Sequence, residues 1–272
     1  MREKWKGIDW MEYLIFTYAL IFISGLFFGT FANVCIKRWH DRTPLFCATT
    51  CDTCGHKIPW CDTVPVLSFF LNKGKCGYCH APIPLQNLVV ELVTGFTFLA
   101  IFSGYGFSLE GIKMLLVAWM FIVGTVSDIN YREVPNELTL IALIAMPTFI
   151  LLNVNSLLDT LWGVIPAIWI VLFACIVAHF TGQEDIIGGG DVKFMFSVGG
   201  LMGMEFVLLM FVLGCISLAL MYGSFIIESA ITKGAKGTSV PMLVGFSQAY
   251  ALMLLMHYLA DARFDVFGGF LP

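Results

Sequence analysis

The chain has 272 residues, of which 58% are hydrophobic and 12% are charged, and its formal net charge at pH 7 is -4. A soluble domain carries about a quarter charged residues, so a chain with a mean hydropathy of +0.85 needs lipid around its outer surface. The small net charge gives no sign of a nucleic-acid partner. We therefore expect an all-α integral membrane protein in contact with the lipid bilayer.

Apolar segments along the chain predict about eight transmembrane helices, since a crossing takes about 20 apolar residues. The segments are approximately 12–35, 87–105, 111–127, 138–154, 158–180, 192–203, 205–227 and 240–260. The sixth is short and rich in glycine, which leaves seven as the alternative. The first lacks a small-residue cleavage site, so it is expected to remain as the first transmembrane helix. The chain then divides into that helix (1–35), a polar insert (36–86) and a polytopic domain (87–272).

The distribution of Lys and Arg predicts which side of the membrane each loop faces. With eight crossings and a cytosolic insert, ten basic residues are cytosolic and five lie on the other side. The cytosolic ones are Lys37, Arg38, Arg42, Lys57, Lys73, Lys75, Arg132, Lys193, Lys233 and Lys236; the others are Arg2, Lys4, Lys6, Lys113 and Arg263. The basic N-terminus argues mildly against this orientation. It places the loops 128–137 and 181–191 on the same, cytosolic, face.

Two aspartates stand at the ends of apolar segments in those loops. Asp128 directly follows an apolar run, where an ionisable group is costly and is a functional candidate. Pro135 prevents the helix from continuing, and Asn136 is the expected N-cap of the next helix. Asp191 follows Gly188, Gly189 and Gly190. Glycine has no side chain to restrict the backbone, so three in a row let another chain approach closely.

Two carboxylates on one membrane face suggest a catalytic pair. Like charges close together share one proton, so one member can take a proton from water while the other polarises a peptide carbonyl. Each aspartate alone has a simpler interpretation, Asp128 as a helix end at the headgroups and Asp191 as an N-cap after a tight turn. Glu184 and Asp185 are interpreted as solvated loop charges.

The insert carries two Cys-x-x-Cys pairs, Cys51 with Cys54 and Cys76 with Cys79, separated by 21 residues. This spacing is close to that of four-cysteine zinc ribbons, and four thiolates around Zn²⁺ make a closed structural site. Disulfides or a redox pair are the alternatives, and a cytosolic location opposes disulfides. His56 and His80 adjoin the pairs and are not expected to be ligands.

Glu91 is an acid inside an apolar run and should face protein or water. It is predicted to pair with Lys37 or Arg38, or with the new amino group of a substrate. No Gly-rich nucleotide-binding fingerprint in a βαβ setting is present.

Several motifs in order resemble one family of bacterial membrane enzymes. Gly188-x-Gly190-Asp191-Val192-Lys193-Phe194, with Asp128 before Val134-Pro135-Asn136, resembles the GxGD-type aspartic proteases, and more narrowly the type IV prepilin peptidases. Gly29–Val34, the four-cysteine insert, Ile58–Ser68 and Ala81–Pro84 are similar to their N-terminal half. The chain departs from the family at Val240–Phe246, where many members carry Pro-Phe-Gly-Pro.

The resemblance implies a cytoplasmic (inner) membrane enzyme of bacteria, with its insert and active site on the cytosolic side. Such enzymes cleave the leader of type IV prepilins or pseudopilins, and those with the cysteine insert commonly methylate the new N-terminus with S-adenosylmethionine. Asp128 and Asp191 would be catalytic, Gly188, Gly189, Gly190 and Lys193 would support the catalytic loop, and Glu91 and Asn33 are candidates for methyl transfer. The alternatives are a peptidase without methylation, and a zinc-stabilised transporter or scaffold with an Asp128/Asp191 ion site.

Overall fold

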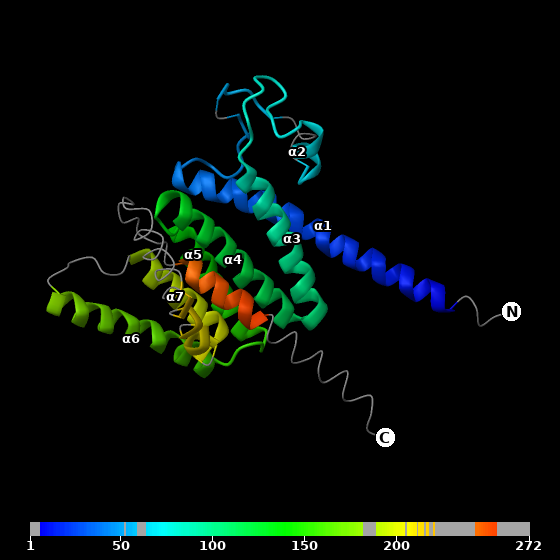
Figure 1. The fold of residues 1–272 in the computed structure, drawn as a ribbon. Helices are drawn as coiled ribbons and strands as arrows, with labels where there is room; N and C mark the ends of the chain where they lie inside the picture. Colours follow the sequence, from blue (N-terminus) through cyan, green and yellow to red (C-terminus); the bar gives the residue numbers. More distant parts are fainter. Residues whose placement is uncertain are drawn as a thin grey trace. The chain divides into compact units, whose positions relative to one another are not determined.

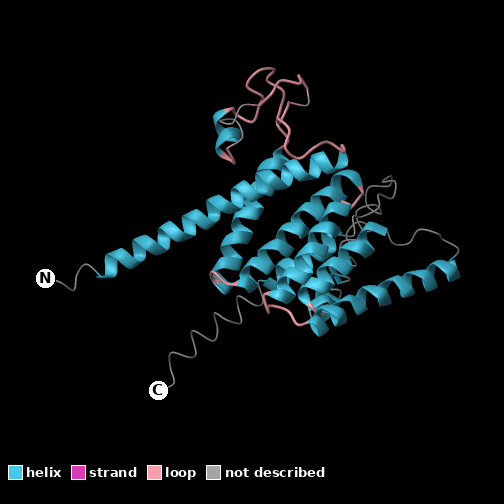
Figure 2. Ribbon diagram, turned by 180° about the vertical axis from the view of Figure 1, so that it is seen from behind, coloured by secondary structure: helices cyan, strands magenta, loops and turns pink. Residues whose placement is uncertain are grey.

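The computed structural model describes residues 6–51, 53–58, 64–181, 189–204, 206–210, 212–214, 216, 217, 220 and 243–254. These residues form helices joined by loops, as Figure 2 shows, and two isolated β-bridges in the insert. The chain divides into two compact units, Met1–Gly111 and Ile112–Pro272. The first unit contains the predicted first transmembrane helix, the insert and the first helix of the predicted polytopic domain.

The first unit consists of two long helices with the insert between them in sequence (Figure 1). Helix α1 spans Lys6–His40 and α3 spans Leu85–Tyr105, and the two pack against each other. Gly25 and Gly29 of α1 face α3 so closely that a Cβ on Gly25 would lie 2.8 Å from the Cα of Gly95. Small residues four apart are a usual way for membrane helices to approach. The insert adds one short helix, α2 at Leu67–Leu71.

The second unit is a helical bundle. Its elements are α4 (Leu109–Tyr131, which begins in the first unit), α5 (Asn136–Leu151), α6 (Leu157–Thr181), α7 (Gly189–Met202) and a helix at Leu243–Leu254. Helix α7 packs against both α5 and α6. Gly163 and Gly199 lie so close that a Cβ on either would overlap the carbonyl of the other. The bundle core includes Met120, Phe121, Leu138, Phe194 and Leu201, all at most 2% exposed.

Within the described residues, three helices are long and apolar enough to cross a membrane: Glu12–His40, Leu85–Tyr105 and Leu109–Tyr131. Three more apolar helices are shorter, at Asn136–Leu151, Leu157–Pro166 and Leu243–Leu254. The prediction of a mostly helical membrane protein is confirmed at this level, and the count of eight spans stays a prediction. At 1.5 Å per residue α1 is about 50 Å long, longer than a bilayer core of about 30 Å. Its basic last turn, with Lys37, Arg38 and His40, therefore has room to extend beyond the lipid.

Candidate functional site

Asp128 lies in the last turn of α4. Its side chain is buried, with 8% of its surface exposed. The helix ends three residues later at Tyr131, and Arg132 adopts a φ of 58° while its N–H donates to the Asp128 carbonyl at 3.0 Å. A residue in the left-handed conformation is a common helix ending. Asp128 therefore still belongs to the regular part of α4, and the chain changes direction only after Tyr131.

The Asp128 carboxylate accepts a main-chain hydrogen bond from a distant part of the chain. The N–H of Leu243, the first described residue of the Leu243–Leu254 helix, donates to Oδ2 at 3.2 Å. A hydrogen bond donated to a carboxylate favours its ionised form. Sequence reasoning did not find Leu243, because a main-chain donor leaves no mark in residue type. Pro241, where the family motif is altered, lies outside the described residues.

Asp191 is the third residue of α7, as expected for a helix start. Its Oδ1 atom is buried and has no hydrogen-bond partner within the part of the chain that is described. Burial and, to a smaller extent, the nearby charge of Asp128 raise the pKa of Asp191 from 3.8 to about 6. The structure thus brings the two predicted aspartates into electrostatic contact, although they are 63 positions apart.

The start of α7 packs against the turn between α4 and α5. A Cβ on Gly190 would lie 3.1 Å from the Cβ of Val134, whereas one on Gly189 would meet no atom of the described residues within 4 Å. The close approach expected of the glycines is therefore found at Gly190. Gly188, Glu184 and Asp185 lie outside the described residues.

Lys193 joins the same two segments, because its Nζ donates to Oδ1 of Asn136 at 3.0 Å. Asn136 is not the N-cap of α5, as the sequence suggested. Pro135 occupies that position without a side-chain cap, and Asn136 is the first helical residue. The Asn136 side chain is used for the contact with Lys193, which explains why an N-cap residue type stands one position late.

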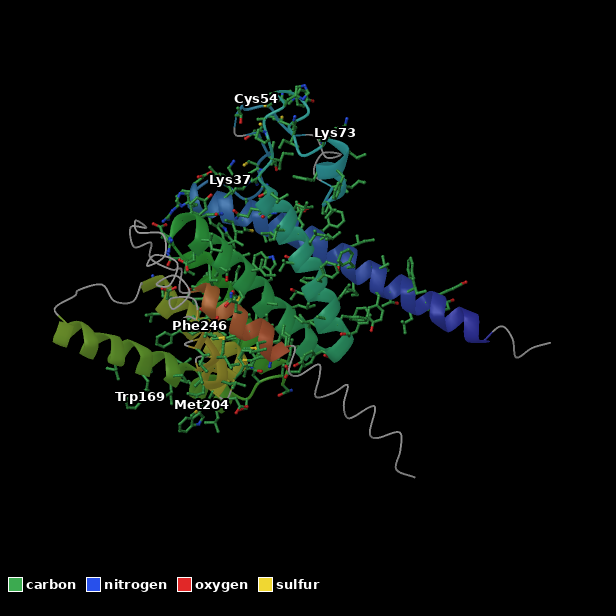
Figure 3. The ribbon with its side chains drawn as sticks, in the orientation of Figure 1. Lys37, Cys54, Lys73, Trp169, Met204 and Phe246 are labelled. Atoms are coloured by element: carbon green, nitrogen blue, oxygen red, sulfur yellow. The ribbon has the colours of Figure 1, made fainter. Side chains whose placement is uncertain are left out.

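Aromatic rings fill the bundle beneath the aspartates. Phe121 of α4 meets Phe194 of α7 edge to face at 5.0 Å between ring centroids and stacks on Tyr250 at 4.9 Å. Gly124 lets these elements converge, since a Cβ there would lie 2.8 Å from Leu243. Phe246, labelled in Figure 3, belongs to the same helix as Leu243 and is buried. The packing fixes three helices that carry or contact the two carboxylates.

The arrangement contains two carboxylates in unlike surroundings. Asp128 has a main-chain donor, and Asp191 has a buried oxygen without one. Unlike environments separate the proton affinities of two acids, so that one is ready to accept a proton and the other to donate one. The same pair also offers oxygen ligands to a cation. Geometry alone therefore admits acid–base chemistry or an ion site.

The four cysteines of the insert meet at one point. The sulfur atoms of Cys51, Cys54, Cys76 and Cys79 all lie within 4.8 Å of one another, and Cys51 Sγ is 3.8 Å from Cys79 Sγ. Tetrahedral Zn²⁺ with Zn–S bonds of about 2.3 Å requires sulfur separations of about 3.8 Å. Figure 3 shows Cys54 and Lys73 in the insert, beyond the end of α1 that carries Lys37. The donor set and its spacing fit a structural zinc site.

The two Cys-x-x-Cys segments share a pattern of main-chain hydrogen bonds. In the first, the N–H of Cys51 donates to the His56 carbonyl and that of Gly55 to the Cys51 carbonyl. In the second, Cys76 donates to Ala81 and His80 donates to Cys76 at equivalent positions. Gly55 and His80 both have a positive φ, 68° and 59°.

This repeated turn directs main-chain N–H groups at the first sulfur. Hydrogen bonds from Cys54 and Thr53 lower the pKa of the Cys51 thiol to about 6, which favours the thiolate that binds a metal. The His56 ring contacts the Tyr78 ring at 3.5 Å between centroids, and His80 forms part of the second turn. The cluster of possible metal ligands among the described residues consists of the four cysteines.

Glu91 and Asn33 both lie where α1 and α3 touch. The Glu91 carboxylate accepts hydrogen bonds from the Thr30 hydroxyl at 2.9 Å and from the Val66 N–H at 2.8 Å. Asn33 Nδ2 donates to the Asn87 carbonyl at 3.0 Å. Arg38, one of the partners predicted for Glu91, donates to carbonyl groups of the insert.

Comparison with known proteins gives two family matches that follow one another along the chain. Residues 23–105 match the bacterial peptidase A24 N-terminal domain, and residues 114–224 match the type IV leader peptidase family. A prepilin leader peptidase/N-methyltransferase of Vibrio cholerae is 32% identical over 76% of this chain and 85% of its own length. One of Bacillus subtilis is 27% identical over 89% and 93%. No solved structure matches.

Proposed function

The chain belongs to the type IV leader peptidase family, and we propose that it cleaves the leader of type IV prepilins or pilin-like proteins and then methylates the new N-terminus. The names of its relatives support both activities. The observation that carries the peptidase half is the electrostatic contact between Asp128 and Asp191, within a helical bundle. Both acids lie within residues 114–224, the segment that matches the type IV leader peptidase family.

Cleavage by this pair needs one ionised and one protonated carboxyl group. Asp128 is the proposed base, because it accepts the Leu243 N–H, and a hydrogen bond to a carboxylate favours its ionised form. Asp191 is the proposed acid, because its pKa is raised by burial and by Asp128. Asp128 takes a proton from water as the water oxygen bonds to the scissile carbonyl carbon, and Asp191 donates to the carbonyl oxygen. The C–N bond then breaks: the leaving nitrogen receives the proton held by Asp128, and one hydroxyl of the tetrahedral intermediate returns a proton to Asp191, which leaves a carboxylic acid and an amine.

The supporting residues act on the position of Asp191. Gly190 permits the contact of α7 with Val134, and Lys193 bonds Asn136 across the same junction. We propose that these contacts hold Asp191 opposite Asp128, and that Gly189, the first residue of α7, contributes only backbone freedom, because no described atom lies within 4 Å of a Cβ there. The sequence motif alone links Gly188 to this role.

The four-cysteine insert is proposed to hold structural Zn²⁺, which would supply folding energy to a segment with little apolar core. S-adenosylmethionine is the proposed methyl donor, as the methyltransferase name of the relatives implies. We place the insert and both aspartates on the cytosolic side of the bacterial inner membrane, on the distribution of Lys and Arg and on family resemblance.

Two other functions compete with this one. A peptidase without methyl transfer would use the insert only to hold its substrate. A transporter or scaffold would use Asp128 and Asp191 as a cation site. The unpartnered Asp191 oxygen is compatible with a cation, but the family relationship favours hydrolysis.

Mass spectrometry of a pilin precursor separates the three. The purified protein is incubated with precursor and S-adenosylmethionine, and the product should lose its leader and gain one methyl group. Asp128→Asn and Asp191→Asn should each reduce cleavage by about 10³-fold, within the range for loss of an acid or base, and should still methylate a precursor supplied without its leader. Cleavage that survives either substitution rejects the aspartic mechanism. A cleaved but unmethylated product rejects the transferase, and an uncleaved precursor favours the ion site.

A further inference from the structure

Glu91 stands at the junction of α1, α3 and the insert, and both of its carboxylate oxygens have protein donors. Oε1 accepts the hydroxyl hydrogen of Thr30 in α1, and Oε2 accepts the N–H of Val66, which precedes α2 in the insert. The position of Glu91 itself depends on Gly29, where a Cβ would lie 2.6 Å from the Cα of Glu91. Glu91 is therefore fixed at its Cα and at both carboxylate oxygens, which indicates a structural contact and not a ligand-binding site.

Val66 is the residue of the insert that Glu91 holds in place. It has φ 60° and ψ -50°, a conformation that β-branched residues rarely adopt. Such a residue persists only where its surroundings fix it, and the hydrogen bond to Glu91 is the described contact of its N–H group. The short helix α2 follows directly, and the N–H of Phe70 donates to the Val66 carbonyl. Glu91 therefore fixes the direction in which α2 leaves the membrane helices.

Arg38 attaches the other end of the insert. Its buried guanidinium donates to the carbonyl groups of Pro44, Leu45 and Cys47 and lies 3.4 Å from the Thr49 hydroxyl. These residues lead directly into the first cysteine pair, which begins at Cys51. The insert is thus attached to α1 before its first cysteine pair and to α3 between the two pairs.

We propose that Glu91 is a positioning residue for methyl transfer: it seats the cysteine insert on α1 and α3 through Val66 and does not itself contact the amino group or the methyl donor. This inference rests on the proposed methyltransferase function. It replaces a charge-based role of Glu91 with a hydrogen-bonding one, and the two roles respond differently to loss of charge.

Glu91→Gln and Glu91→Ala form the matched pair that tests it. A glutamine keeps the shape: its Oε1 accepts the Val66 N–H, and its Nε2 donates to the Thr30 oxygen. The Thr30 hydroxyl is then free to donate to the Leu26 carbonyl, which lies 3.3 Å away. An alanine removes both contacts. Glu12→Gln and Glu12→Ala, at an exposed acid of α1, control for loss of a carboxylate.

Methylation of a leaderless pilin peptide is the first measurement. We expect Glu91→Gln to keep kcat for methylation within about threefold of wild type and Glu91→Ala to lower it about tenfold or more, with cleavage of the precursor unchanged in both. An equal loss in the two variants overturns the proposal, because it assigns the role to the charge. A parallel loss of cleavage also overturns it, because the effect is then not confined to the insert.

Hydrogen exchange at the Val66 amide is the second measurement and does not depend on activity. Exchange should be faster in Glu91→Ala than in wild type and unchanged in Glu91→Gln. If Glu91→Ala does not fold, Thr30→Val removes one contact only and should show a smaller effect in the same direction. Equal exchange of the Val66 amide in all variants would show that Glu91 does not hold Val66 in place. A wild-type protein that does not methylate rejects the proposed transferase and leaves this second test intact.

Discussion

The cysteine cluster and the aspartate pair are built from opposite materials. The cluster gathers four residues from within 29 positions of sequence, two of them exposed, on turns made by local main-chain hydrogen bonds. The pair gathers two residues 63 positions apart, in helices packed through Phe121, Phe194 and Gly124. One site relies on a ligand to hold a segment with little core, and the other relies on apolar packing to hold two acids that repel each other.

The difference shows where each site is vulnerable. The cysteine site depends on its metal, because few apolar side chains of the insert are buried. The aspartate site depends on close approach, because the carboxylates interact only while the start of α7 stays against the α4–α5 turn. Damage to the first should stay within the insert, and damage to the second should change catalysis without loss of metal.

Loss of zinc should have the largest effect. Cys76→Ser removes one of four ligands, and structural zinc sites contribute on the order of 10 kcal/mol to folding. We expect bound zinc, measured by elemental analysis, to fall from one ion per chain to almost none, and protease cleavage within residues 36–86 to become rapid.

Cys47→Ser is the control, because Cys47 is an exposed cysteine outside the cluster. It should keep the metal and its resistance to protease. A Cys76→Ser protein that keeps zinc and resists protease would show that the insert is held by its contacts with α1 and α3 alone.

A methyl group at Gly190 should have the next largest effect. The Cβ of Gly190→Ala would lie 3.1 Å from Val134, which pushes α7 away from the turn. Displacement of a catalytic group by a fraction of an ångström lowers rates by about 10- to 100-fold. We expect precursor cleavage to fall by that amount while zinc content stays at one ion.

Gly189→Ala makes the same change one residue earlier, where the part of the chain that is described has no atom within 4 Å of the added Cβ. It should retain cleavage and slightly favour the helix. Equal losses in the two variants would mean that backbone freedom, and not the contact with Val134, is what the glycines provide.

The pH dependence of stability should reveal the cost of ionising Asp191, which comes mainly from its burial and also from the charge of Asp128. Because the pKa of Asp191 is raised from 3.8 to about 6, the folded protein binds this proton more tightly than the unfolded chain does. The resulting stabilisation is present in full below the unfolded pKa and is lost as pH rises through about 6. The Tm of Asp191→Asn minus that of wild type should therefore grow by roughly 2–4 °C as the pH rises from about 5 to about 8.

Glu133→Gln, at an exposed acid of the neighbouring turn, should show no such gain. Thermal unfolding at each pH gives both comparisons. A constant difference between Asp191→Asn and wild type across this range would mean that Asp191 is not destabilised by ionisation.

The contact between Lys193 and Asn136 should have the smallest effect, because both side chains are exposed. A double-mutant cycle with Lys193→Ala and Asn136→Ala should give a coupling free energy of about 0.5–1.5 kcal/mol in chemical unfolding. A coupling of zero would leave Gly190 as the contact that holds α7 to the turn.

The sequence predicted local features best. The Cys-x-x-Cys spacing predicted the meeting of Cys51, Cys54, Cys76 and Cys79, because a knuckle is a short-range turn. The apolar runs predicted where the helices lie. They did not decide how many helices cross the membrane, since α5 and α7 have 16 and 14 residues, fewer than the usual crossing of about 20.

Long-range partners were the features that the sequence could not supply. Asp128 meets a main-chain N–H, and Glu91 meets another, and any residue type except proline offers that group. Charge complementarity suggested Lys37 or Arg38 as partners of Glu91, but the carbonyl groups of the insert engage Arg38. Asn136 was expected to cap α5 and serves Lys193, because a side-chain amide fits either use.

The hydrogen bond from Leu243 to Asp128 also determines when, during synthesis of the chain, the site can be completed. The donor is 115 positions after its acceptor, so a ribosome has already made both aspartates when the residue that contacts the first of them is still to come. A nascent chain that stops before the last described helix carries the acids without the group that favours charge on Asp128. Synthesis itself thereby delays the appearance of a complete site until Leu243 has been made.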